Sequence, residues 1–215
     1  MTETTPRRNQ ENKRKGTLFV ISAPSGTGKT TLCQKLLKKN RDLKLSVSYT
    51  TRQPRKGETN NVDYTFVSKA KFIKMVDKGE FAEWATVHGN LYGTSIKRLR
   101  KLNTEGYDII LDIDIHGARQ LKNNYENAVF IFVLPPSINA LKNRLVKRGT
   151  DSKDVITNRL DNAKAEIAYY KDYDYLIIND RLDKAYRELE SIIIASRLTT
   201  SKVDTRWIKK VYNVK

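Results

Sequence analysis

The stretch Thr17–Thr31, with the sequence TLFVISAPSGTGKTT, decides how the rest of this 215-residue chain is interpreted. Its apolar, β-branched start, residues 17–21, predicts a buried strand. A loop of small residues follows, and Leu32, Leu36 and Leu37 then lie on one face of a predicted helix. A strand, a glycine-containing loop, a Lys-Thr pair and a helix, in this order, are typical of a phosphate-binding P-loop.

This P-loop predicts a site for the phosphates of a nucleotide. Loop N–H groups converge on phosphate oxygens, and the helix start adds a partial positive charge. Lys29 supplies a mobile charge for the β- and γ-phosphates, and Thr30 supplies a hydroxyl ligand for Mg²⁺. The strict pattern has glycine where this chain has Ala23, which we interpret as a tolerated variant because the spacing to Lys29 is intact. A flexible turn before an ordinary helix is the alternative. The expected phosphate-binding residues are Ala23, Pro24, Ser25, Gly26, Thr27, Gly28, Lys29, Thr30 and Thr31.

The chain is strongly basic, with 41 Lys and Arg against 24 Asp and Glu, a net charge of +17. Both termini contribute: residues 1–15 hold five basic and two acidic groups, and residues 202–215 hold five basic and one acidic. Such charge suits nucleic acid, a membrane surface or a small polyphosphate. Because we find neither an RNA-binding aromatic motif nor a DNA-reading module, we favour a nucleotide enzyme and expect no nucleic-acid partner. We expect residues 1–15 to be a disordered basic arm and 200–215 a basic C-terminal extension.

The length of the apolar runs and the cysteine content indicate in which cellular compartment such a chain would work. The longest apolar run, residues 128–134, is far below the ~18 residues that span a bilayer, so we expect no membrane association. The single cysteine, Cys33, excludes an intrachain disulfide and a multi-cysteine zinc site, and we expect it to be a packing residue. A chain without disulfides suits the reducing cytosol, and we expect a cytoplasmic protein.

Strands that alternate with helices after residue 95 indicate an α/β fold, with a parallel sheet and helices on both faces. We expect a three-layer α/β/α P-loop core formed by residues 16–44 and 95–199. The segment between them, residues 45–94, is expected to be a mostly β insertion. The short strands predicted within it cover residues 45–48, 62–67, 81–87 and 91–92.

Ordered motifs from about residue 16 to residue 198 resemble those of guanylate kinases, a family of nucleoside monophosphate kinases. The motifs are SAPSGTGKTT, SVSYTTRQPRKGE, VDYTFVS, FAEWATVHGNLYGT, IILDIDIHGA, RLVKRGTD and IINDRLDKA. The resemblance implies ATP and GMP as substrates, Mg²⁺ as cofactor, and ADP and GDP as products. It also implies that residues 45–94 bind GMP and that residues 148–160 form a short helical lid over ATP.

The resemblance further implies a set of GMP-binding residues. Arg52 and Arg55 would hold the phosphate through forked donors, and without the family match we would interpret them as a solvated basic loop. Glu83 would accept hydrogen bonds from guanine N1 and N2 and so select guanine over adenine; its alternative is a strand residue that points to solvent. The family usually has serine at Thr94, and the hydroxyl is kept. The matched residues are Ser48, Arg52, Arg55, Tyr64, Glu83, Tyr92, Thr94 and Asp114.

Asp112 ends an apolar strand, a Walker-B-like placement suited to hold Mg²⁺ together with Thr30. Asp114 would share its face of the strand if the strand continued. Either carboxylate could instead be a structural cap. The resemblance places Arg148 and Asn179 beside ATP, with the arginines around the lid neutralising the transferred phosphoryl group, although arginines on helices are commonly solvated. The catalytic residues that it implies are Lys29, Arg52, Arg144, Arg148 and Arg159.

Three other functions remain open from the sequence. A guanylate-kinase-like module can bind peptides without catalysis, but here Lys29, Thr30, Arg52 and Glu83 persist. A related kinase could phosphorylate a different acceptor, which the pair of carboxylates argues against. The basic termini could also bind RNA in addition to catalysis.

Overall fold

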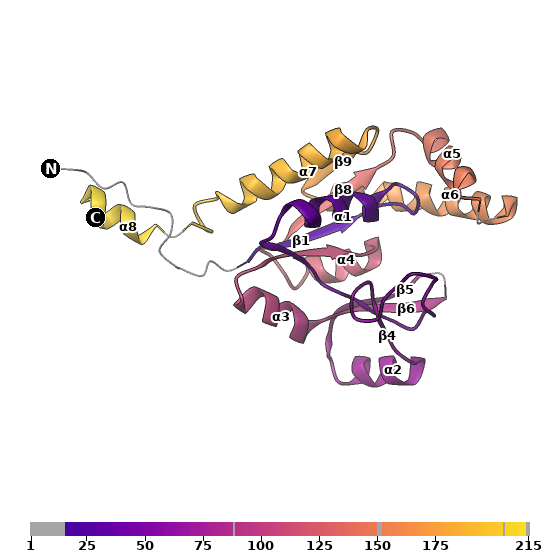
Figure 1. The fold of residues 1–215 in the computed structure, drawn as a ribbon, viewed down its shortest axis with the longest axis horizontal. Helices are drawn as coiled ribbons and strands as arrows, with labels where there is room; N and C mark the ends of the chain where they lie inside the picture. Colours follow the sequence, from indigo (N-terminus) through magenta and orange to yellow (C-terminus); the bar gives the residue numbers. More distant parts are fainter. Residues whose placement is uncertain (1–15, 88, 150–151, 204, 214–215) are drawn as a thin grey trace.

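The computed structural model describes residues 16–87, 89–149, 152–203 and 205–213. Its central sheet has five strands in the order β2-β7-β1-β8-β9, all paired in parallel (Figure 1). The strands are β1 (Leu18–Ser22), β2 (Leu43–Leu45), β7 (Asp108–Asp112), β8 (Val129–Leu134) and β9 (Tyr175–Ile178). The predicted α/β class with a central parallel sheet is therefore confirmed.

Alternation within β1 explains why helices cover both faces of this sheet. Phe19 and Ile21 pack with apolar side chains of α1 (Lys29–Lys39) and α7 (Leu182–Arg197). Val20 points the other way, into a cluster with residues of α3 (Ile96–Thr104) and α4 (Ile115–Lys122). Because successive strand residues face opposite sides, an apolar run of this kind must be covered on both.

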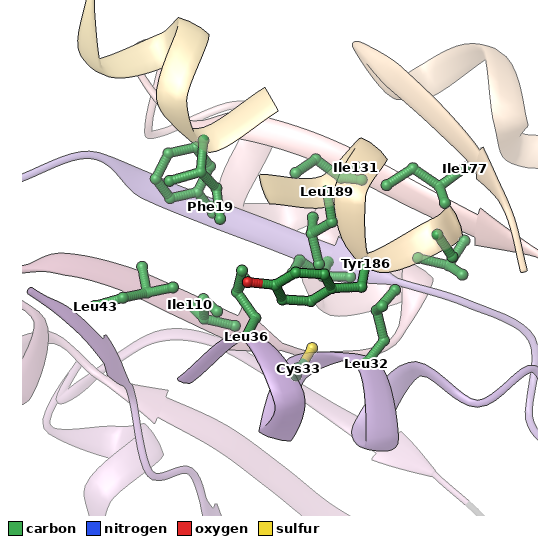
Figure 2. Close-up of a cluster of buried hydrophobic side chains, with 14 residues drawn as sticks. Phe19, Leu32, Cys33, Leu36, Leu43, Ile110, Ile131, Ile177, Tyr186 and Leu189 are labelled. Carbon is green, nitrogen blue, oxygen red and sulfur yellow. The ribbon is translucent and has the colours of Figure 1, made fainter. Parts of the chain in front are cut away.

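Figure 2 shows how α1 and α7 meet over the sheet. Leu36 of α1 and Leu189 of α7 lie in one buried cluster with Tyr186 and strand residues such as Ile131. Cys33 belongs to the same cluster and is only 2% exposed, so the prediction of a packing residue is confirmed. Burial raises the pKa of its thiol well above the usual value, which keeps the group protonated and unreactive.

The insertion forms a separate sheet with the order β4-β3-β6-β5, of which only the β3–β4 pair is parallel. Its elements are β3 (Tyr49–Thr50), β4 (Thr65–Phe66), α2 (Lys69–Asp77), β5 (Phe81–Val87) and β6 (Asn90–Ser95). Two predicted strands are wrong in extent. The strand predicted over residues 45–48 is instead β2, which lies in the core sheet and ends at Leu45. The strand predicted over residues 62–67 is limited to β4, because Asn61, at φ 63°, turns the chain before it. The domain boundaries themselves remain a prediction, and residues 1–15 lie outside the described residues.

Four further helical elements complete the described part of the chain. α5 (Ile138–Arg148) and α6 (Lys153–Ile167) flank the predicted lid break, and the 3₁₀ helix η1 (Ala168–Asp172) returns the chain to β9. α8 (Arg206–Tyr212) lies in the C-terminal extension and stands away from the sheet in Figure 1. None of the helices in the described part of the chain is long and apolar enough to cross a membrane.

A buried carboxylate fastens the amino end of β1 and the end of α7 to the sheet. Asp108 is fully buried at the start of β7. It accepts hydrogen bonds from the backbone N–H of Thr17, at 2.8 Å, and from Nε of Arg197, at 2.6 Å. A buried ion pair of this kind tolerates the loss of one partner poorly, because the other charge is left uncompensated.

The variant Asp108→Ala should therefore lower the free energy of unfolding by about 3 kcal/mol, measured by urea denaturation. The exposed Asp77, changed to alanine, is the matched control and should alter the free energy by less than about 0.5 kcal/mol. Equal effects of the two substitutions would show that the buried pair contributes nothing specific.

Candidate active site

The loop between β1 and α1 has the backbone geometry of an anion-binding turn. Gly26 and Gly28 adopt φ of +92° and +96°, a region that favours glycine. A Cβ atom at Gly28 would also lie 2.7 Å from Nδ2 of Asn179. α1 begins at Lys29 with Gly28 as N-cap and no side-chain cap, and its first turn holds no acidic residue. The first N–H groups of α1 are thus placed to receive a phosphate.

Lys29, Thr30 and Asp112 come together at the carboxyl end of the central sheet. Parallel pairing sets Ile21 of β1 opposite Asp112 of β7. Nζ of Lys29 lies 2.5 Å from Oδ1 of Asp112 and donates to the carbonyl of Ile113 at 2.7 Å. Oγ1 of Thr30 donates to Oδ2 of the same aspartate at 3.3 Å. The two predicted metal ligands are therefore in direct contact.

A cavity of about 440 Å³ borders the glycine half of the loop. Two of the predicted residues on its wall fix the loop backbone. Asn179 donates from Nδ2 to the carbonyl of Thr27 at 2.8 Å, and Arg144 donates to the same carbonyl at 2.9 Å. Arg144 also donates to the backbone carbonyl of Asn179, at 2.7 Å. The residues that line this cavity are Gly26, Thr27, Gly28, Thr31, Arg144, Lys147, Asn179, Asp180 and Leu182.

A second cavity, of about 220 Å³, borders the other half of the loop and faces the insertion. It brings together five of the predicted GMP-binding residues with Asp112. Its wall comes from the P-loop, the insertion, the end of β7 and α6. The lining residues are Ala23, Ser25, Ser48, Tyr64, Glu83, Ala85, Val87, Tyr92, Asp112, Ile113, Asp114 and Glu166.

Glu83 points into this second cavity and not to solvent. Its carboxylate is nearly buried, with 4% of the residue exposed, and accepts a hydrogen bond from Oγ1 of Thr94 at 2.5 Å. A Cβ atom on Gly117 would lie 2.4 Å from Oε2, so α4 approaches the carboxylate through a glycine. Burial raises the pKa of Glu83 to about 7, partly offset by the hydrogen bond from Thr94.

Asp114 is a structural cap, one of the alternatives that the sequence left open, and it also lines the second cavity. Its Oδ1 accepts the backbone N–H of Gly117 at 2.8 Å, so it is the N-cap of α4. It also lines the second cavity, where it faces Glu83 across the start of that helix. The cap engages Oδ1 of the carboxylate.

The two predicted phosphate-binding arginines lie differently. Arg52 is held by Glu58, with Nη2 at 2.7 and 3.0 Å from its carboxylate oxygens, and its guanidinium lies over the ring of Tyr64. This contact lowers the pKa of Glu58. The Arg55 side chain is exposed, and its backbone N–H donates to Glu58. In the described residues neither arginine lines the second cavity, although Arg52 packs against its wall at Tyr64.

Sequence reasoning did not single out Glu58, Gly117 or Glu166. Glu58 was visible within the RQPRKGE motif, whereas Gly117 and Glu166 gain their positions only through the tertiary fold. Arg159 is half-buried on α6 and does not line either of the cavities described above. The side chain of Arg148 lies outside the described part of the structure.

The fold and the two cavities define a P-loop α/β protein of the kinase class, with a second binding region opposite its nucleotide loop. A family model described as guanylate kinase matches residues 15–196 of this chain. The chain belongs to the guanylate kinase family.

Individual relatives agree with this assignment over nearly the whole chain. A guanylate kinase of Geobacter metallireducens is 56% identical over 191 residues, which cover 89% of this chain and 94% of the relative. One of Clostridioides difficile is 46% identical, covering 92% and 96%. The crystal structure of guanylate kinase from Anaplasma phagocytophilum superposes with a TM-score of 0.79 at 31% identity, covering 94% of this chain and 98% of the other.

The raised pKa of Glu83 predicts how stability changes with pH. The folded state holds this proton up to about pH 7, whereas the unfolded chain releases it near 4.5. The protonated folded form is thus favoured at low pH, and this contribution is lost as the pH rises through 7. Relative to Glu83→Gln, the wild type should lose about 2.5 kcal/mol of unfolding free energy between pH 5 and pH 8. Urea denaturation at both pH values measures this.

Glu105→Gln, an exposed carboxylate, serves as the control and should track the wild type within about 0.5 kcal/mol at both pH values. A stability difference between wild type and Glu83→Gln that stays constant with pH would contradict the assigned titration.

Proposed function

We propose that this chain transfers the γ-phosphoryl group of ATP to GMP and releases ADP and GDP. The observation that carries the proposal is the pair of cavities on either side of one P-loop. One borders the start of α1, and the other holds the buried acceptor Glu83 beside Asp114. Family membership supports the same reaction.

ATP is proposed to occupy the cavity beside Asn179, with its phosphates along the loop and Lys29 near the β- and γ-phosphates. In the free protein Lys29 is paired with Asp112. Entry of the phosphates would exchange this partner for phosphate oxygens and leave the aspartate to a cation. The lysine would then move with the charge that it neutralises.

Magnesium is the proposed cofactor, and the residues present fit it. Thr30 and Asp112 offer a hydroxyl and a carboxylate oxygen in contact with each other, and Mg²⁺ prefers oxygen ligands with several waters retained. When bound, the ion would neutralise charge on the phosphates and orient them.

The phosphate of GMP is proposed to be held by Tyr64, Tyr92, Arg52 and Arg55.

Guanine is proposed to lie against Glu83, Asp114, Ser48 and Thr94. A buried carboxylate that accepts N–H donors discriminates strongly, because adenine presents an acceptor at N1 and would leave the carboxylate unpaired. The phosphate of GMP is itself the nucleophile. Positioning and charge neutralisation then supply most of the rate acceleration. We propose that Arg144, Arg148 and Arg159 contribute to this neutralisation.

ATP and GMP are small cytosolic molecules, and we propose that the protein works in the cytoplasm.

One assay tests the proposal directly: ADP release from MgATP with GMP, AMP, CMP and UMP supplied separately. We expect turnover with GMP at least about 100-fold above the other three in kcat/KM, as hydrogen-bond discrimination allows. Comparable turnover with another monophosphate would identify a kinase with a different acceptor. An absence of turnover with all four would indicate a binding module.

Lys29→Ala should lower kcat by at least about 100-fold, because a charge on the transferred group is no longer compensated. The fold should survive, since the Lys29 side chain is not part of the apolar core and bonds only to Asp112 and the carbonyl of Ile113 among the described residues. The matched control is Lys38→Ala, an exposed lysine on the same helix, which should keep wild-type kcat. A Lys29→Ala protein with wild-type kcat would refute the role of this residue.

A further inference from the structure

The carboxylate of Glu166 is a feature of the second cavity that the proposed reaction does not yet use. It lines the cavity together with three other acidic residues, Glu83, Asp112 and Asp114. Of the described residues on that wall, Glu166 alone comes from α6, the helix that begins at the lid break. The lid helix therefore reaches into the acceptor cavity.

This carboxylate has no hydrogen-bond or ion-pair partner among the described residues, although it is half-buried. Burial, and next the nearby Asp114, raise its pKa, while Lys29 and His116 act in the opposite direction. Each of the other three acidic residues is already engaged: Glu83 with Thr94, Asp112 with Lys29 and Asp114 with the first turn of α4. A hydrogen-bond donor that entered the cavity would relieve the cost of holding Glu166 there.

The nucleoside of the acceptor is the part that can supply such a donor. An ionised carboxylate accepts hydrogen bonds and cannot donate, so it suits N–H and O–H groups and repels a phosphate dianion. GMP offers two donors beyond the guanine N1–H: the exocyclic 2-amino group and the ribose 2′-hydroxyl. Both share the chemistry of a neutral donor.

Helix geometry links this contact to the lid. Arg159 lies seven residues before Glu166, so the two side chains project from nearly the same face of α6, about 10 Å apart along its axis. Arg159 is one of the arginines around the lid that the resemblance places near the transferred phosphoryl group. A single helix thus carries a cation for the reacting centre and a carboxylate for the acceptor.

We propose that Glu166 accepts a hydrogen bond from the 2-amino group or the ribose 2′-hydroxyl of GMP, and that this bond couples occupancy of the acceptor cavity to the position of α6 and Arg159. The inference rests on the proposed reaction. It makes Glu166, on α6, a second residue that recognises the acceptor, in addition to Glu83 on β5.

Matched nucleotides test which donor is used. kcat/KM is measured for GMP, for dGMP, which lacks the 2′-hydroxyl, and for IMP, which lacks the 2-amino group, with wild type and Glu166→Ala. We expect Glu166→Ala to lower kcat/KM for GMP by at least about tenfold, the effect of a charged hydrogen bond. The loss should be several-fold smaller for the one analogue that lacks the donor.

A smaller loss with dGMP identifies the hydroxyl, and a smaller loss with IMP identifies the amino group. Equal losses of kcat/KM with all three nucleotides, or no loss, would overturn the proposed hydrogen bond between Glu166 and GMP. Asp161→Ala, on the solvent side of the same helix, is the control and should match the wild type with each nucleotide. Glu166→Gln keeps the shape of the side chain. If the alanine variant folds poorly, the losses of kcat/KM with GMP, dGMP and IMP are compared for this variant instead.

The coupling is measured by binding of a non-hydrolysable ATP analogue with and without saturating GMP. In the wild type, saturating GMP should lower the dissociation constant of the ATP analogue by at least about threefold, which corresponds to a modest coupling free energy. Glu166→Ala should reduce this factor to about one, and an unchanged factor would overturn the link to the lid. Should the wild type not phosphorylate GMP at all, the proposed function fails, whereas normal turnover with unchanged ratios removes only the role of Glu166.

Discussion

The parallel pairing of β1 with β7 is the constraint on which the rest of this structure depends. It sets Ile21 opposite Asp112, so the strand that leads into the P-loop ends beside the strand that carries the carboxylates. From that register Asp112 meets Lys29 and Thr30, and Asp114, two residues further on, reaches the second cavity. A slip of one residue would turn these side chains to the other face of the sheet.

The electrostatics of the site follow from this arrangement. The loop side is built from backbone N–H groups, a helix start and Lys29, which together favour phosphate. The second cavity concentrates four carboxylates in a small volume, and burial keeps the pKa of Glu83 at about 7. The charges therefore suit anionic oxygens in one cavity and neutral N–H and O–H donors in the other. The phosphate of the proposed acceptor would lie at Tyr64, on the wall of this cavity, where the Arg52 guanidinium packs.

The sequence was sufficient for the core and for the local motifs, because these are set by periodicity and spacing. The P-loop, Asp112 at a strand end and the buried Cys33 were all predicted in this way. Contacts between distant segments were not: at Gly117 only a glycine lets α4 approach Glu83, and Glu166 lines the cavity from α6. The strand predicted over residues 62–67 was too long because its alternation could not reveal the turn at Asn61. For Asp114 the pattern offered a cap or a ligand-binding group, and the fold makes it the cap of a helix on the wall of the second cavity.

The most direct test of the account is a crystal structure of this protein with GMP and ADP bound together. The account predicts guanine against Glu83 and Asp114, its phosphate beside Arg52 and Tyr64, and the ADP phosphates along residues 23–31 with Lys29 turned from Asp112 towards them. GMP bound in the cavity beside Asn179, or a Glu83 carboxylate without contact to the base, would contradict it.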